Sequence, residues 1–101
     1  MNLHTMAAYL IAEVTVTNSE QMAQYREWSS RAIAEHGAEI IIRGSDIQTL
    51  EGDWRPDRIV VLKFADCAAV KAYYDSATYV QARKVREGAG TIRILAVQGA
   101  N

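Results

Sequence analysis

The sequence has one cysteine, Cys67, and one proline, Pro56. A single thiol cannot form a disulfide within the chain, and no histidine or second cysteine stands at zinc-ligand spacing beside it. We therefore expect a protein of the cytoplasm, where thiols stay reduced, whose fold is held without disulfides and without a metal site.

The chain also lacks an excess of either charge, because its 11 Lys and Arg residues nearly balance its 12 Asp and Glu residues and leave a formal net charge of −1. Proteins that bind nucleic acid or anionic membranes usually carry a basic excess. No apolar run approaches the length of about 20 residues that spans a bilayer, and the first residues contain no signal-peptide pattern. We predict no nucleic-acid or membrane partner, and we expect residues 1–6 to form a flexible extension.

The motifs of several large enzyme classes are absent as well. The chain contains no GxGxxG after a strand, no P-loop, no HExxH and no GxSxG. Haem would need an axial ligand such as histidine, and only His4 and His36 are present. We expect no cofactor, and the sequence alone identifies no reaction.

The patterns that are present predict one α+β domain over residues 1–101. Four runs rich in β-branched residues have side chains that alternate with a period of two residues, which predicts four strands. Apolar residues at three- and four-residue spacing predict a helix opened by a capping box of Thr17 with Glu20 and ended at Gly37, and Asp66 and Ser76 suit helix N-caps. The predicted strands are 8–16, 39–43, 58–64 and 91–97, and the predicted helices are 19–36, 67–75 and 77–87.

This order is the β-α-β-β-α-β of the ferredoxin-like fold, a four-stranded antiparallel sheet with helices on one face. The other face would expose apolar residues such as Ile11, Ile41 and Leu95. A second copy of the chain is the simplest cover for such a face, so we predict a homodimer.

Several segments resemble the domain of unknown function 1330 family from about Ala8 to Val97. They are Arg43-Gly44, Leu50 to Trp54, Arg58 to Phe64 and Tyr74 to Tyr79, with Arg86 downstream. The resemblance implies a unit of the dimeric α/β barrel superfamily, usually a small bacterial protein without an assigned reaction.

That superfamily includes cofactor-free oxygenases, haem-degrading enzymes and lactone isomerases, so the resemblance leaves the activity open. One departure from the family pattern is Ser45, where a second glycine is common, and it affects only the local turn.

The segment between Arg43 and Arg58 predicts a hairpin at a functional edge. Trp54 stands in this polar loop, where it contacts a ligand, closes the dimer or covers the hairpin. Arg43 and Arg58 could clamp a carboxylate, although the acidic residues beside them (Asp46, Glu51, Asp53 and Asp57) favour internal ion pairs.

Tyrosines are numerous for so short a chain, and their positions place Tyr25, Tyr73, Tyr74 and Tyr79 where helices meet the sheet. They could line an aromatic pocket whose hydroxyls orient a ligand, or they could pack in the core with satisfied hydroxyls.

Two residues are candidates for catalysis, Glu13 and His36. Glu13 interrupts an apolar strand and must pair with a cation such as Lys63 or Arg93, or else serve as a base. His36 could act as a general base, since histidine is the side chain that ordinarily titrates near neutrality, but at a helix end it also suits the helix dipole.

The function predicted from these residues is binding of a small organic molecule in a helix–sheet cleft, with cofactor-free oxygenase or isomerase activity drawn from the superfamily alone. The alternative is a ligand-binding or structural dimer module without turnover. Whether the protein is an enzyme stays open.

Overall fold

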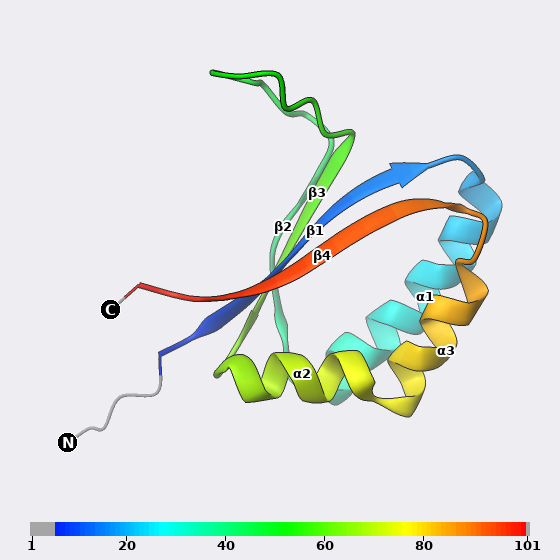
Figure 1. The fold of residues 1–101 in the computed structure, drawn as a ribbon. Coiled ribbons are helices and arrows are strands. Elements are labelled where there is room, and N and C mark those ends of the chain that lie inside the picture. The colour runs from blue at the N-terminus through cyan, green and yellow to red at the C-terminus, as the bar shows by residue number, and fades with distance from the viewer. Residues whose placement is uncertain (1–5, 101) are drawn as a thin grey trace.

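The structure, a computed structural model, describes residues 6–100. Residues 1–5, which include His4 and most of the predicted extension, lie outside the described range. Within it the chain forms the predicted ferredoxin-like fold, with two consecutive helices in the second crossover (Figure 1). The elements are β1 (Ala8–Val16), α1 (Ser19–Glu35), β2 (Glu39–Gly44), β3 (Arg58–Phe64), α2 (Cys67–Asp75), α3 (Ala77–Val85) and β4 (Gly90–Gln98).

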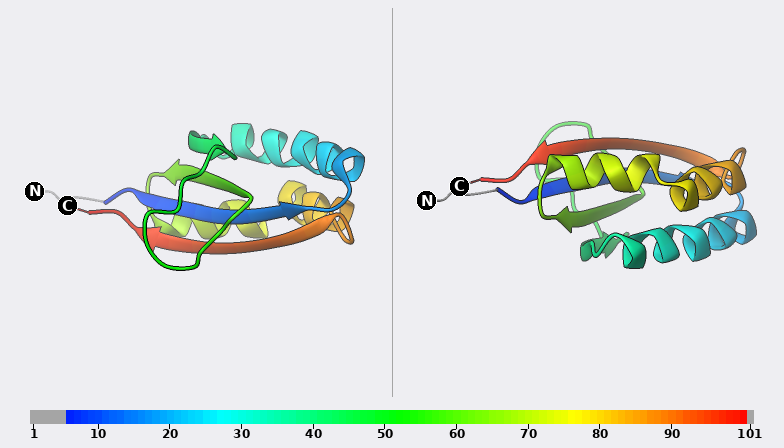
Figure 2. Two further views of the ribbon diagram at one scale, coloured as in Figure 1. Left: turned by 90° about the horizontal axis from the view of Figure 1, so that it is seen from above. Right: turned by 90° about the horizontal axis from the view of Figure 1, so that it is seen from below.

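The strands form one antiparallel sheet in the order β2-β3-β1-β4, with all helices on one face (Figure 2). Strand β1 lies in the middle, and every second side chain of it points to the helices and is buried: Ala8, Leu10, Ala12 and Val14. Two of these four are alanines, so helices can approach the strand closely. Leu62 and Phe64 of β3 continue the same core.

Asn18, one residue after the predicted position, caps the start of α1. Its side-chain oxygen accepts a hydrogen bond from the backbone N–H of Gln21 at 3.0 Å. The capping box predicted for Thr17 with Glu20 is therefore wrong, because the N–H of Thr17 instead donates to the carbonyl of Ala89 at 2.8 Å and holds Thr17 in the connection from β1.

The other predicted helix ends agree with the structure. His36 follows α1 and Gly37 has the positive φ of 64° that favours glycine. Asp66 caps α2 through a 2.8 Å bond from the N–H of Ala69, and Ser76 caps α3. Helix α3 ends at Val85, two residues earlier than predicted.

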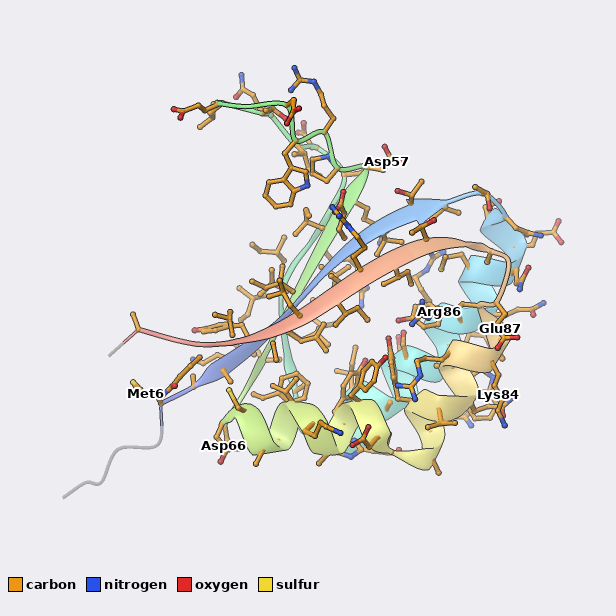
Figure 3. All side chains as sticks on the ribbon, viewed as in Figure 1. Met6, Asp57, Asp66, Lys84, Arg86 and Glu87 are labelled. Carbon is orange, nitrogen blue, oxygen red and sulfur yellow. The ribbon has the colours of Figure 1, made fainter. Side chains whose placement is uncertain are left out.

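The β2–β3 hairpin carries an irregularity between Ile40 and Ile42 and a long loop, residues 45–57. The loop extends beyond the sheet on the side away from the helices (Figure 1). Asp57 stands at its base, where β3 begins (Figure 3). None of the helices in residues 6–100 is both long and apolar enough to cross a membrane.

Candidate functional site

A cavity of about 60 Å³ lies between the sheet and helices α1 and α3. Since one water needs roughly 10–15 Å³ of such volume, the cavity has room for a few waters or a small ligand. Its walls are mostly apolar, which is typical of small-molecule sites. Lining side chains include Leu10, Ala12, Met22, Val60, Leu62, Ile92 and Ile94.

Two tyrosine hydroxyls meet in the wall of this cavity. The hydroxyl of Tyr25 on α1 lies 2.6 Å from that of Tyr79 on α3, and the two rings pack edge to face. Ser76 positions Tyr79, because its side chain caps the helix by accepting from the Tyr79 N–H at 3.1 Å. Tyr79 is only 1% exposed, so its hydroxyl depends on this contact.

Tyr79 is also the centre of the predicted aromatic cluster. Its ring centroid lies 4.7 Å from that of Tyr73 and 5.7 Å from that of Tyr74. Tyr25, Tyr73 and Tyr79 line the cavity, whereas Tyr74 faces a separate groove beside Cys67 and Lys71. Of the four tyrosines that the sequence placed where helices meet the sheet, three line this cavity and Tyr74 does not.

Burial raises the pKa of Tyr25 far above its usual range, and the adjacent Tyr79 acts in the same direction. Burial raises the pKa of Tyr73 as well. The guanidinium of Arg86 lies 5.4 Å from the Tyr25 ring centroid and opposes the shift of the Tyr25 pKa without cancelling it. Arg86 follows α3 on the side that faces α1, and its buried Nε has no partner within the described chain (Figure 3). At neutral pH these phenols are hydrogen-bond donors and not bases.

Three arginines line the same cavity from three elements: Arg26 on α1, Arg43 on β2 and Arg58 on β3. Arg43 pairs in register with Val60, and Arg58 stands two residues before Val60, so both arginines share the helix-facing side of adjacent strands. Arg43 and Arg58, which flank the loop in the sequence, thus line the same cavity, and their role as a carboxylate clamp stays a prediction. The ion pairs expected for them with the loop carboxylates do not form within residues 6–100, where those carboxylates are exposed.

Arg26 was not among the residues named from the sequence. Its position contained a usable signal, because Arg26 follows Met22 by four residues and precedes Ser29 by three. Those two neighbours are buried, so helical spacing alone places Arg26 at the edge of the inward stripe.

Glu13 and Trp54 lie on the opposite, open face of the sheet. Glu13 pairs with Arg93, which is one of its two predicted partners. The Nε of Arg93 donates to Glu13 Oε1 at 3.0 Å. This hydrogen bond holds the pKa of Glu13 below its usual range, and the nearby indole of Trp54 acts in the same direction. Glu13, Arg93 and Trp54 line a separate pocket of about 350 Å³ with Ile11 and Ile59. Trp54 therefore does not share a site with Arg43 and Arg58.

His36 also lies away from the cavity lining. Its Nδ1 is 3.0 Å from the carbonyl oxygen of Ala32, and its ring packs against Tyr73 with centroids 5.9 Å apart. These contacts match the helix-end role more closely than that of a base. Cys67 is exposed, and no cluster of metal-ligating side chains occurs in the described part of the chain.

Solved structures of similar fold span almost the whole chain. A protein of unknown function from Rhodopseudomonas palustris is 17% identical with a TM-score of 0.78, over 97% of this chain and 85% of its own. A dimeric ferredoxin-like protein of unknown function from Jannaschia sp. is 16% identical with a TM-score of 0.68, over 92% and 99%. SnoaB, a cofactor-independent oxygenase from Streptomyces nogalater, is 8% identical with a TM-score of 0.67, over 96% of each chain.

At these identities the similarity establishes the fold and not the activity. No curated protein matches the chain. The model of one family does match it, over residues 7–100, and the chain accordingly belongs to the family described as domain of unknown function DUF1330.

Proposed function

We propose that this member of the DUF1330 family binds a small organic molecule in the cavity between α1, α3 and the sheet. The observation that carries the proposal is the pair of hydroxyls of Tyr25 and Tyr79, 2.6 Å apart in the wall of a mostly apolar cavity. Apolar walls with a few convergent polar groups are the usual form of a ligand site, in which the polar groups fix the orientation of the ligand.

The chemistry of the wall favours recognition of an oxygen atom. Both phenols are protonated at neutral pH and one of them donates to the other, so the pair keeps one O–H that can donate to a carbonyl, enolate or phenolate oxygen. Such donation would support cofactor-free oxygenase or isomerase chemistry on a substrate that becomes negatively charged. The similar fold of a cofactor-independent oxygenase is consistent with this reading and does not establish it.

A specific observation favours the second candidate, a binding protein without turnover. No carboxylate or imidazole of residues 6–100 lines the cavity, and Glu13 and His36 both lie elsewhere. Proton abstraction would need a base in reach of the ligand. We therefore place binding first, and any turnover would act on a substrate that arrives already ionised.

We also propose that the protein is a homodimer joined through the open face of the sheet. The strand registers align Ile42, Val61, Ile11 and Leu95 in one apolar row across all four strands. Leu95 is 57% exposed and Ile42 is 48% exposed, so a second copy would remove considerable apolar surface from water. A similar solved structure is described as dimeric, which supports the proposal.

Leu95→Glu tests the dimer. Covering the exposed part of Leu95 stabilises by about 1–2 kcal/mol per copy, or about 2–4 kcal/mol in a symmetric dimer, which is roughly 30-fold or more in the dissociation constant. Sedimentation velocity should find the parent protein as a dimer and the variant as a monomer. Ala34→Glu introduces the same charge at an exposed position of helix α1, on the helix side of the sheet, and this variant should remain dimeric. A parent protein that is monomeric at micromolar concentration would contradict the proposal.

Binding in the cavity is tested by amide-resolved NMR with a panel of compounds of two to four carbon atoms that includes acetamide and propionamide. We expect at least one compound to shift signals of the cavity residues in a saturable way. Ser29→Leu places a larger side chain in the cavity and should abolish the shifts, whereas Ser30→Leu makes the same change at an exposed neighbouring position and should not. Shifts confined to the open face of the sheet, or none at all, would refute the proposal.

A further inference from the structure

We infer that the ligand of this cavity is a small organic anion, with a carboxylate as the charged group, bound by the guanidinium groups of Arg26, Arg43 and Arg58. The inference rests on the proposed function and adds the chemical class of the ligand. It follows from the charges around the cavity, the contacts of the other arginines and the apolar walls.

The lining of the cavity contains three positive side chains and no negative one. Arg26, Arg43 and Arg58 come from α1, β2 and β3, so folding places arginines of three different elements in the lining of one cavity. Like charges gathered at one site repel one another, and a bound anion would offset that repulsion. The same charges disfavour a cationic ligand.

The remaining arginines outside the hairpin loop each have an aromatic or ion-pair partner, and of these Arg86 has a buried Nε that makes no hydrogen bond within residues 6–100. Arg31 stacks on the ring of Trp28 at 4.4 Å, and Arg83 stacks on Tyr74 and donates to its carbonyl. Arg86 lies over Tyr25, and Arg93 pairs with Glu13.

By contrast, the three cavity arginines have no ion pair and no aromatic partner in residues 6–100. Their donors are thus free to bind a ligand.

Carboxylate matches this set of groups well. The planar guanidinium group can donate two parallel hydrogen bonds to the two oxygens of a carboxylate, and such charge-assisted pairs are among the stronger hydrogen bonds in proteins. The apolar wall residues would cover a short hydrocarbon group, and the O–H that is left free in the Tyr25–Tyr79 pair would donate to a second oxygen. A small acid with a further carbonyl or hydroxyl oxygen would use each of these groups.

The experiment compares acetate with acetamide, which have nearly the same shape, differ in charge and are small enough for a cavity of about 60 Å³, by NMR titration at pH 7 and low salt. Acetate should bind on the order of tenfold more tightly. Propionate and propionamide repeat the comparison with a larger hydrocarbon group. Adding salt should weaken the binding of the acids and leave that of the amides unchanged, because the guanidinium groups are at least partly exposed.

Variants assign the preference to the arginines. Arg43→Gln and Arg58→Gln should each lower acetate affinity on the order of tenfold and leave acetamide affinity unchanged. Arg31→Gln, on the exposed face of α1, is the matched control and should change neither. Amide spectra of all three variants should retain the dispersion of the parent, which verifies that they fold.

The possible results separate this inference from the proposed function. If acetamide binds in the cavity as tightly as acetate, or if the two arginine variants bind acetate like the control, the anion assignment is overturned and the cavity remains a ligand site. If no compound of either charge shifts the cavity signals, the proposed function fails and this inference fails with it.

Discussion

Removing the hydroxyl of Tyr25 tests the contact on which the proposed site depends. Tyr25→Phe keeps the ring and its edge-to-face packing on Tyr79, so the change is confined to one oxygen atom. The hydroxyl of Tyr79 then loses its partner at 2.6 Å while the residue stays 1% exposed. A buried hydroxyl without a partner costs about 1–3 kcal/mol of folding free energy.

The two single variants should lose different amounts of folding free energy. Tyr79→Phe leaves the hydroxyl of Tyr25, a half-buried residue that water reaches more easily, so its cost should fall near the lower end of that range. The double variant removes both hydroxyls and leaves neither unpaired. Its loss of stability should therefore be smaller than the sum of the single losses by about 1 kcal/mol.

Thermal and urea unfolding followed by circular dichroism measure this cycle. For a domain of about 100 residues, each 1 kcal/mol lowers Tm by about 4–8 °C, so Tyr25→Phe should lower Tm by at least several degrees. Tyr9→Phe, at a half-exposed tyrosine with no side-chain hydrogen bond in residues 6–100, is the control and should change Tm little. Strictly additive losses, or an unchanged Tm for Tyr25→Phe, would refute a hydroxyl pair at this site.

Two further predictions concern the sheet. The pKa of Glu13 is lowered from 4.5 by Arg93, so its stabilising effect is complete above pH 4.5 and is lost as the pH falls through the lower folded value. Glu13→Gln should therefore flatten the decline of Tm with acid, and parent and variant curves that run parallel below pH 4.5 would contradict the pairing. Gly90→Ala should cost about 2–5 kcal/mol in urea unfolding, because the new Cβ would lie 2.0 Å from the carbonyl oxygen of Thr15 and φ is 156°. Gly88→Ala, with φ of 81° and open space around it, should cost only about 1–2 kcal/mol, and equal losses for the two variants would contradict the close approach.

Local residue patterns were sufficient to predict most of the fold. The alternation in residues 8–16 and 58–64 matches β1 and β3 at both ends, because side chains on a strand face opposite sides in turn and only one side of this sheet meets helices. Asp66 and Gly37 marked helix ends through short-range hydrogen bonding and backbone conformation. The pairing of Glu13 with a cation also followed from local information, since a carboxylate among apolar residues needs a partner.

The arrangement of the site depended on contacts between distant segments. Trp54, Arg43 and Arg58 are neighbours in the hairpin sequence, yet the arginines line the helix side of the sheet and Trp54 lies over the open side. The strand register and the path of the loop decide which face of the sheet each side chain lies on. The irregularity between Ile40 and Ile42 shifts that register. These are set by hydrogen bonds between strands and not by the residues within each one.

The cavity itself has the same origin. Tyr25 and Tyr79 are 54 positions apart, and their hydroxyls meet only because α1 and α3 pack side by side on the sheet. Arg26 joins Arg43 and Arg58 for the same reason. The residues able to bind a ligand could be named from local chemistry, but the packing of helices on the sheet decided which of them share one cavity.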